Sequence, residues 1–193
     1  MKRFLVLTTI LLIAIQTAFC QNQSGANNTN NSSSKVDQFL NVNDQLIEKE
    51  FTTIGEVKGL KVQVVHLTNQ SINEHISALV FVYVYADPNT SQELTSTAYI
   101  DSDEVDAFVN ACKTIQFKIL PTTPTDYVES NFYTAGGFEL KCYWGKLNGL
   151  SKKDWIINFK LDSNNEGANV NLKSDDFKQV VAYLLQAQDK LKK

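Results

Sequence analysis

The chain has 193 residues, of which 43% are hydrophobic and 20% charged, and its formal net charge at pH 7 is −3. A mildly acidic protein has no general electrostatic attraction to nucleic acid or anionic lipid, so the charge argues against both as non-specific partners. No apolar segment beyond residue 20 approaches the length that spans a bilayer, and we expect no membrane span after that point.

Residues 1–20 have the layout of a secretory signal peptide. A short positive segment precedes an apolar run at residues 4–15, which is too short for a helix that stays in the bilayer. Ala18 and Cys20 place small side chains at positions −3 and −1 of a cleavage before Gln21. We therefore expect an exported protein, periplasmic or secreted, whose mature form is soluble.

Cys20 also permits a second interpretation, a lipoprotein anchored through that cysteine. The acylation motif requires a Leu-like residue at −3 and a small residue at −1, whereas Thr17 and Phe19 stand there. The bulky Phe19 is the worse mismatch, so soluble export is favoured over the lipid anchor.

Residues 21–35 hold no large apolar side chain and consist mostly of Asn, Ser and Gln. Such a segment cannot bury enough surface to offset its ordering entropy, and we interpret it as a disordered tether. Residues 36–193 are expected to form a single α+β domain, an antiparallel sheet with two helices.

The first half of this domain, residues 46–120, is predicted to contain four strands followed by a helix. The strands are expected at residues 47–57, 60–67, 78–86 and 94–100. Asp101, Asp103 and Glu104 are interpreted as acids at the start of the helix, where the helix dipole favours negative charge. Its apolar side then repeats at helical spacing through Val105, Phe108, Val109, Cys112 and Ile115.

The second half, residues 126–193, repeats this order. Its strands are expected at residues 127–134, 138–145, 155–161 and 168–172, and a helix with Phe177, Val180, Val181, Leu184 and Leu191 on one side follows. The two strand-to-helix junctions align, which suggests two four-strand-plus-helix units packed as one domain. The alternative, that both junctions only share ordinary helix-capping chemistry, is left open.

The best-defined local geometry is the hairpin at residues 127–145. Its connection, residues 135–137, fits a three-residue loop with Gly137 in the left-handed region. That register puts Phe132, Leu140 and Trp144 on one apolar side, whereas a slip of one residue would mix the two faces. The opposite side forms a candidate interaction face of Glu129, Asn131, Tyr133, Glu139, Lys141 and Tyr143. The alternative is an ordinary solvated sheet face.

A search for catalytic machinery assigns no catalytic residue, cofactor or metal. His66 and His75 have no metal-ligand spacing; His66 is expected in a strand and His75 in a loop. Residues 162–167 only faintly resemble a calcium loop, and a turn is favoured there. Cys112 and Cys142 could form a disulfide if both point into one core, but two separate buried thiols are favoured.

The segments AYIDSDEVDAFVNAC and YTAGGFELKCYW, the C-terminal amphipathic helix and the end of the export segment carry a resemblance. They resemble small secreted or periplasmic proteins of unknown function from Bacteroidetes-type bacteria. The resemblance covers most of residues 45–191 and implies no functional residue. In topology alone, the chain also resembles Whirly-type and PUR-type repeats, which bind single-stranded nucleic acid.

The sequence therefore predicts an exported, non-enzymatic module of the bacterial envelope that binds a protein, a peptide or an envelope component. One alternative is an envelope hydrolase that uses acidic residues, which a cleft holding acids of strongly shifted pKa would favour. The other is single-stranded nucleic-acid binding, which a basic stripe with exposed aromatic residues would favour.

Overall fold

The computed structural model describes residues 34–87, 90–146, 152–163, 165 and 167–192. The chain divides into two compact units, Met1–Asn31 and Ser32–Lys193, and all described residues belong to the second. The predicted signal peptide, its cleavage at Gln21 and the lipid-anchor alternative at Cys20 therefore lie outside the described residues. So does the predicted tether, apart from Ser34 and Lys35.

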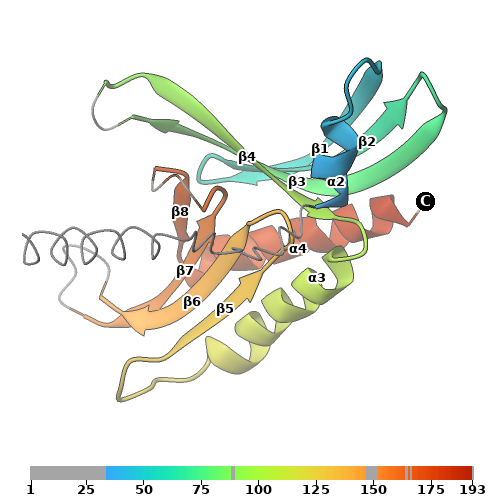
Figure 1. The fold of residues 1–193 in the computed structure, drawn as a ribbon. Coiled ribbons are helices and arrows are strands. Elements are labelled where there is room, and N and C mark those ends of the chain that lie inside the picture. The colour runs from blue at the N-terminus through green and yellow to red at the C-terminus, as the bar shows by residue number, and fades with distance from the viewer. Residues whose placement is uncertain (1–33, 88–89, 147–151, 164, 166, 193) are drawn as a thin grey trace, which may run out of the picture. The chain divides into compact units, whose positions relative to one another are not determined.

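The second unit contains two antiparallel sheets, each built from four strands in sequence order (Figure 1). The first sheet consists of β1 (Ile47–Val57), β2 (Leu60–Asn69), β3 (Glu74–Ala86) and β4 (Glu93–Asp101). The second consists of β5 (Glu129–Tyr133), β6 (Glu139–Gly145), β7 (Asp154–Lys160) and β8 (Asn169–Leu172). Helix α3 (Val105–Thr114) follows the first sheet and α4 (Ser174–Leu191) the second, which confirms the α+β class and the repeated order of four strands and a helix.

Two turns contain residues in the left-handed backbone region. Lys58 and Gly59, between β1 and β2, have φ angles of 53° and 77°, as a two-residue hairpin with a twist matched to its strands requires. Gly137 has φ of 81°, and the Thr134 N–H donates to the Phe138 carbonyl at 3.0 Å. The predicted left-handed Gly137 and the predicted hairpin register are both confirmed.

The first helix is longer than its predicted apolar stripe. After α3, the chain continues as a π-helix, η1 (Ile115–Ile119), so that one wider turn extends the helical segment toward residue 120. Val105, Phe108, Val109 and Cys112 are buried as predicted. Phe117 of η1 is 69% exposed, whereas Ile115 is buried and Ile119 and Leu120 pack against the core, so the apolar side of the helix continues through η1.

One aromatic cluster connects both sheets and both helices. The ring of Phe81 on β3 stacks on Phe138 at 5.2 Å between centroids and meets Phe159 of β7 edge-on at 5.3 Å. Phe108 of α3 contacts Phe81 at 5.9 Å, and Phe177 of α4 contacts Phe159 at 6.2 Å. These rings are fully buried, so the two halves share one hydrophobic core and form one domain rather than two.

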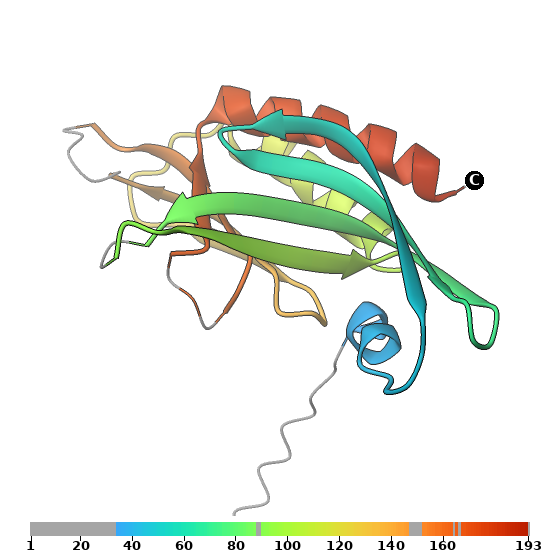
Figure 2. The ribbon, with the colours of Figure 1, turned by 90° about the horizontal axis from the view of Figure 1, so that it is seen from above.

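Helix α4 crosses from its own half of the chain to the other. It packs on β1, β2 and β3 of the first sheet as well as on β7 and β8 (Figure 2). Phe108 of α3 contacts Phe81 of β3 and Phe132 of β5, so both predicted helical stripes pack on antiparallel sheet, as expected. The burial of Val180, Val181 and Leu184 between sheets of both halves explains why neither half has a complete core without the other.

A short helix, α2 (Lys35–Leu40), was not predicted and corrects the tether boundary. Ser34 is buried and caps this helix, because its hydroxyl accepts from the Asp37 N–H at 3.0 Å. Val36 and Phe39 cover the outer face of the first sheet over Val65. The folded region thus includes Ser34, since Ser34 is itself buried and Val36 already belongs to a second, smaller hydrophobic cluster.

Candidate functional site

The outward side of the second sheet, here called the polar sheet face, contains the six residues that the sequence singled out. The observed pairs are Glu129 with Tyr143, Asn131 with Lys141, and Tyr133 with Glu139. Leu140, Cys142 and Trp144 alternate with them along β6 and are buried. Because successive residues of a strand point to opposite sides, the six candidates share the side that turns away from the core.

Strands β7 and β8 extend the polar sheet face with residues that the sequence analysis did not select. Asn158 pairs with Lys141 on one side and with Asn171 on the other, and its amide donates to the Asn171 side-chain oxygen at 3.0 Å. Lys160 lies between Glu139 and Asn169 in the next row. The alternation within residues 154–160 would have located Asn158 and Lys160, but only the register of β7 against β6 places them beside the candidate residues.

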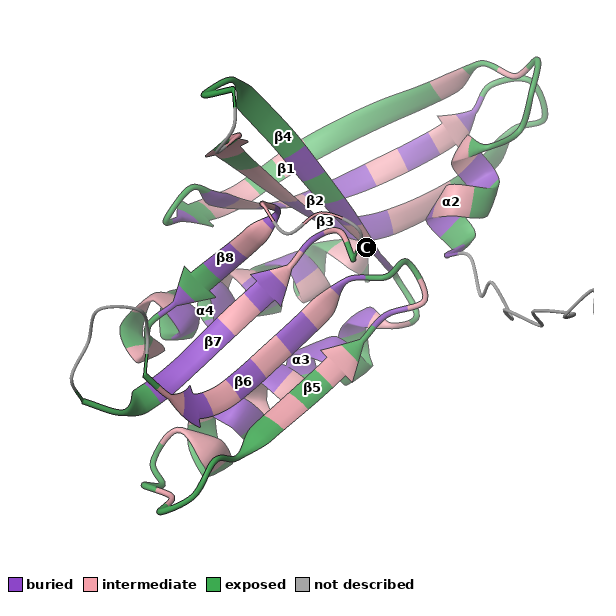
Figure 3. Ribbon diagram, turned by 60° about the vertical axis from the view of Figure 1, so that its left-hand side comes forward, coloured by how far each residue is buried: buried purple, intermediate pink, exposed green. Residues whose placement is uncertain are grey.

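Helices α3 and α4 pack behind the second sheet, on the side opposite the polar sheet face (Figure 3). Tyr133 and the neighbouring Tyr127 are each 62% exposed, which is high for aromatic residues on a folded domain. Tyr143 is half-buried, and its ring lies 6.4 Å from that of Tyr127. The tyrosines therefore present ring surface to solvent rather than to the core, and amide and charged groups surround them.

Charges on the polar sheet face balance in pairs. Lys141 lies 3.9 Å from the carboxylates of both Glu129 and Glu139. Glu129 also accepts hydrogen bonds from the Tyr127 hydroxyl and, at 3.0 Å, from the Asn131 amide. The bond from Tyr127 is the main cause that lowers the pKa of Glu129, and it raises the pKa of Tyr127 in turn. With Lys160 included, two lysines face two glutamates, so the face has no net formal charge.

Tyr133 remains a neutral phenol under all ordinary conditions. Loss of solvent around its hydroxyl raises its pKa, and the negative charge of Glu139 raises it further. Its hydroxyl can consequently donate and accept hydrogen bonds at neutral pH. The polar sheet face as a whole offers rings, amides and paired charges, which suits recognition of a polar partner more than acid–base chemistry.

Acids that the sequence assigned to the start of the first helix have other roles. Asp101 ends β4, is buried, and accepts from the backbone N–H groups of Lys35 at 2.6 Å and Val36 at 3.1 Å. Asp103 forms an exposed ion pair with Lys35 at 2.6 Å. Glu104 accepts from the Ala135 N–H at 2.9 Å and so connects α3 with the hairpin loop. Glu104 is the N-cap residue and Asp103 precedes it, so both lie at the helix start as predicted, whereas Asp101 ends β4 and binds α2, and the helix-dipole interpretation is wrong for Asp101.

Other shifted carboxylates also have surface partners that account for them. The pKa of Asp106 is lowered mainly by a hydrogen bond from Gln188, and that of Asp175 mainly by one from Lys178. Both acids are exposed, and their shifts favour the charged form that an isolated carboxylate already has at neutral pH. They do not form the paired, oppositely shifted acids that a hydrolase site would require.

The histidines are held by hydroxyl groups of neighbouring strands. His66 Nδ1 lies 2.7 Å from the Ser77 hydroxyl, and His75 Nδ1 lies 3.0 Å from that of Thr68. His75 lies in β3, so its predicted loop position is wrong. Within the described residues, no group of three or more His, Cys, Asp or Glu side chains is placed to hold a metal ion.

Cys112 and Cys142 are both free and buried in the shared core. The structure therefore contains two separate thiols, the favoured of the two sequence interpretations, and the disulfide alternative is not formed. Burial raises the pKa of Cys142 to about 12 and raises that of Cys112 as well. Thiols that stay protonated and enclosed are poor nucleophiles, so neither cysteine is a catalytic candidate.

Comparison with protein-family models, with curated proteins and with solved structures finds no match to this chain. Within the described ranges, no helix is both long enough and apolar enough to cross a membrane. The assignment of a function consequently depends on the residues and their geometry.

Proposed function

We propose that the chain is an exported, non-enzymatic binding module of the bacterial envelope, and that the polar sheet face contacts its partner. The observation that carries this proposal is the uncovered side of the second sheet, where exposed Tyr127 and Tyr133 lie among amides and balanced charges. Aromatic rings with a polar end are enriched where proteins bind partners, because they supply contact area at low entropic cost.

The composition of the face favours a partner of low net charge. Glu129 and Glu139 neutralise Lys141 and Lys160, so a polyanion gains little from counterion release on this surface. Amide groups such as Asn158 and Asn171 can pair with peptide groups or sugar hydroxyls. A peptide or a polysaccharide of the envelope therefore suits the face better than single-stranded nucleic acid does.

Export is supported by the sequence pattern of residues 1–20, a positive start followed by a short apolar run and small residues before Gln21. The non-enzymatic character is supported by the structural roles of the acids. Asp101 anchors α2, and Glu104 contacts the hairpin loop.

Co-sedimentation of the mature protein with purified peptidoglycan sacculi would test the proposal. We expect sedimentation of the protein, and its loss in a variant with Tyr127→Ser, Tyr133→Ser and Tyr143→Ser. The matched control is Phe117→Ser, which removes an exposed aromatic residue of η1 away from the face. Equal sedimentation of all three proteins would refute a role of the polar sheet face.

A salt-dependent gel shift with a single-stranded oligonucleotide in the same assay series would favour the nucleic-acid alternative instead. Release of soluble fragments from the sacculi would favour the hydrolase alternative. Each outcome thus assigns the protein to a different class.

A further inference from the structure

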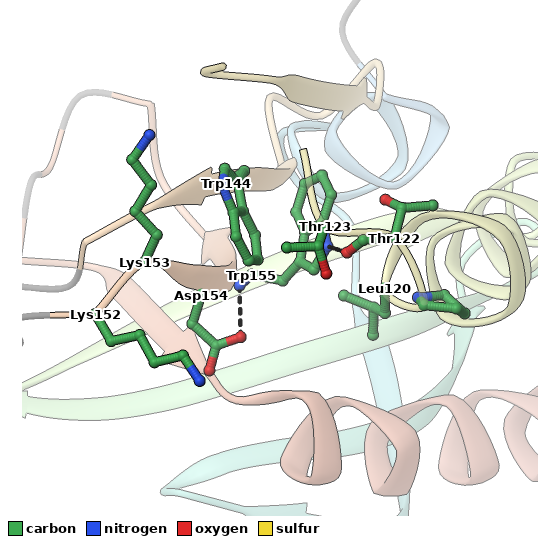
Figure 4. A pocket seen from close by; sticks show the side chains of 9 residues that line it. Leu120, Thr122, Thr123, Trp144, Lys152, Lys153, Asp154 and Trp155 are labelled. Atoms are coloured by element: carbon green, nitrogen blue, oxygen red, sulfur yellow. Dashed lines mark hydrogen bonds between the residues drawn. The ribbon is translucent and has the colours of Figure 1, made fainter. Parts of the chain in front are cut away.

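A cavity of about 380 Å³ lies at the end of the second sheet, apart from the polar sheet face. Its walls come from the segment after η1, at Leu120 and Pro121, and from the ends of β6 and β7, at Trp144 and Trp155 (Figure 4). Volumes of this size hold small ligands, and a wall of apolar and aromatic groups with a few polar ones is typical of ligand sites.

The two tryptophans that line the cavity are the only ones in the chain. Trp144 and Trp155 are directly paired across β6 and β7, and their rings meet edge-on with centroids 5.5 Å apart. The Trp155 indole N–H donates to the Thr122 carbonyl at 2.8 Å, which fixes that ring against the segment after η1. The Trp155 ring is therefore held in place before any ligand enters.

Trp144 has an unsatisfied polar group. Its indole nitrogen is buried, and it has no hydrogen-bond acceptor among the described residues. A buried donor without a partner destabilises the folded protein. A small shift of the indole that brings this N–H to an oxygen atom of a ligand would remove this destabilisation, so the site favours a ligand with oxygen acceptors.

Polar residues at the cavity carry an excess of positive charge. Lys152 and Lys153 supply two ammonium groups, of which Lys153 donates to the Thr125 carbonyl at 3.3 Å. Asp154 supplies one carboxylate, held in place because it accepts from the Trp155 backbone N–H at 2.8 Å (Figure 4). An anionic group pairs with the lysines, while hydroxyl groups can donate to the fixed carboxylate.

From these features we infer that the cavity at Trp144 and Trp155 is a binding site for an acidic monosaccharide of the uronic acid class. The sugar ring lies against the indole rings, its carboxylate pairs with one of the two ammonium groups, which point to opposite sides of residues 152–153 (Figure 4), and a hydroxyl donates to Asp154. A neutral sugar has no carboxylate to pair with a lysine, and an apolar acid has no hydroxyl group to donate to Asp154. This site is independent of the polar sheet face, because Trp144 and Tyr143 point to opposite sides of β6.

Intrinsic fluorescence reports on this site directly, since both tryptophans belong to it. Titration of the mature protein with sodium glucuronate should give a saturable change with a Kd of about 1 mM or tighter. Glucose and cyclohexanecarboxylate, which lack the charge and the hydroxyls respectively, should bind at least tenfold more weakly. Absence of a saturable change with glucuronate, or equal binding of either comparison compound, would overturn the inference.

Lysine variants then test whether the ammonium groups bind the carboxylate of glucuronate. Replacing Lys152 and Lys153 together by Gln should weaken glucuronate binding roughly tenfold or more, as expected for loss of a charge-assisted contact. The matched control replaces two exposed lysines elsewhere, Lys49 and Lys178, by Gln and should bind like the wild type. Unchanged binding in the Lys152/Lys153 variant, with its thermal unfolding also unchanged, contradicts the proposed pairing. The tyrosine variant of the polar sheet face should keep glucuronate binding, which separates this test from that of the proposed function.

Discussion

The ring of Tyr183, on α4, occupies the space that a Cβ atom on Gly55 of β1 would fill. Gly55 also lies where the register of β1 against β2 shifts, between Thr53 and Gly55. The contact joins the last helix of the chain to its first long strand. A residue without a side chain is what permits this close approach between the two halves.

Replacing Gly55 by Ala should force the Tyr183 ring aside and lower the free energy of unfolding by about 1–3 kcal/mol, the usual cost of overpacking. In a Tyr183→Ala background, Gly55→Ala should be neutral or slightly stabilising, because alanine restricts the unfolded chain. Urea denaturation of the four proteins gives the coupling between the two sites. Equal costs in both backgrounds would mean that the ring does not rest on Gly55.

The two sides of the second sheet should respond differently to truncation. Trp144 is buried, and Trp144→Ala should cost about 3–5 kcal/mol of unfolding free energy. Tyr133 is 62% exposed, and Tyr133→Ala should change stability by no more than about 1 kcal/mol. Denaturant unfolding of both variants provides the measurement. A Tyr133 effect as large as that of Trp144 would show that the polar sheet face is covered, and this face could not then be a binding surface.

Asp101 should hold α2 on the first sheet. Asp101→Ala removes the acceptor of the Lys35 and Val36 N–H groups and leaves both unpaired, at a cost of about 1–3 kcal/mol. Hydrogen exchange of α2 should accelerate in this variant more than exchange in β2 or β6. Asp103→Ala is the matched control, because it removes only an exposed ion pair with Lys35. Its effect should remain below about 1 kcal/mol.

The stability of the protein should fall at high pH because of the buried thiols. The pKa of Cys142 is raised from 9.0 to about 12 in the folded protein, so the unfolded chain loses this proton first as the pH rises. The stabilisation that this raised pKa contributes is complete below pH 9. Between pH 9 and 12 it is lost, by up to about 1.4 kcal/mol per pH unit. Urea unfolding at pH 8, 9 and 10 should show a shallower loss for Cys142→Ala than for the wild type. Parallel curves would indicate that Cys142 is open to solvent.

The sequence was sufficient for most of the local structure. The alternation of β6 and the loop with Gly137 determined a register that the structure reproduces pair by pair, from Glu129 with Tyr143 to Tyr133 with Glu139. Such a register is determined locally, because a slip of one residue would expose the apolar side and bury the charged one. The spacing of apolar residues likewise located α3 and α4.

The predictions from the sequence were wrong where a side chain contacts a residue far along the chain. Asp101 resembles a helix-start acid in the sequence, but its partners are N–H groups some 65 residues earlier. The helix at Lys35–Leu40 has a short apolar pattern that is too weak to recognise, and it is stable only where Val36 and Phe39 meet the first sheet.

By itself, the sequence determined the order of elements, the turns and the sorting of β5 and β6 into two faces, because these depend on periodicity and on backbone preferences within a few residues. Only the tertiary structure decided that α4 packs on the first sheet through Tyr183 and Gly55, and that Trp144 and Trp155 share a cavity with Leu120. Contacts between distant segments follow from how the complete core is filled, and no local pattern encodes which apolar surfaces will meet.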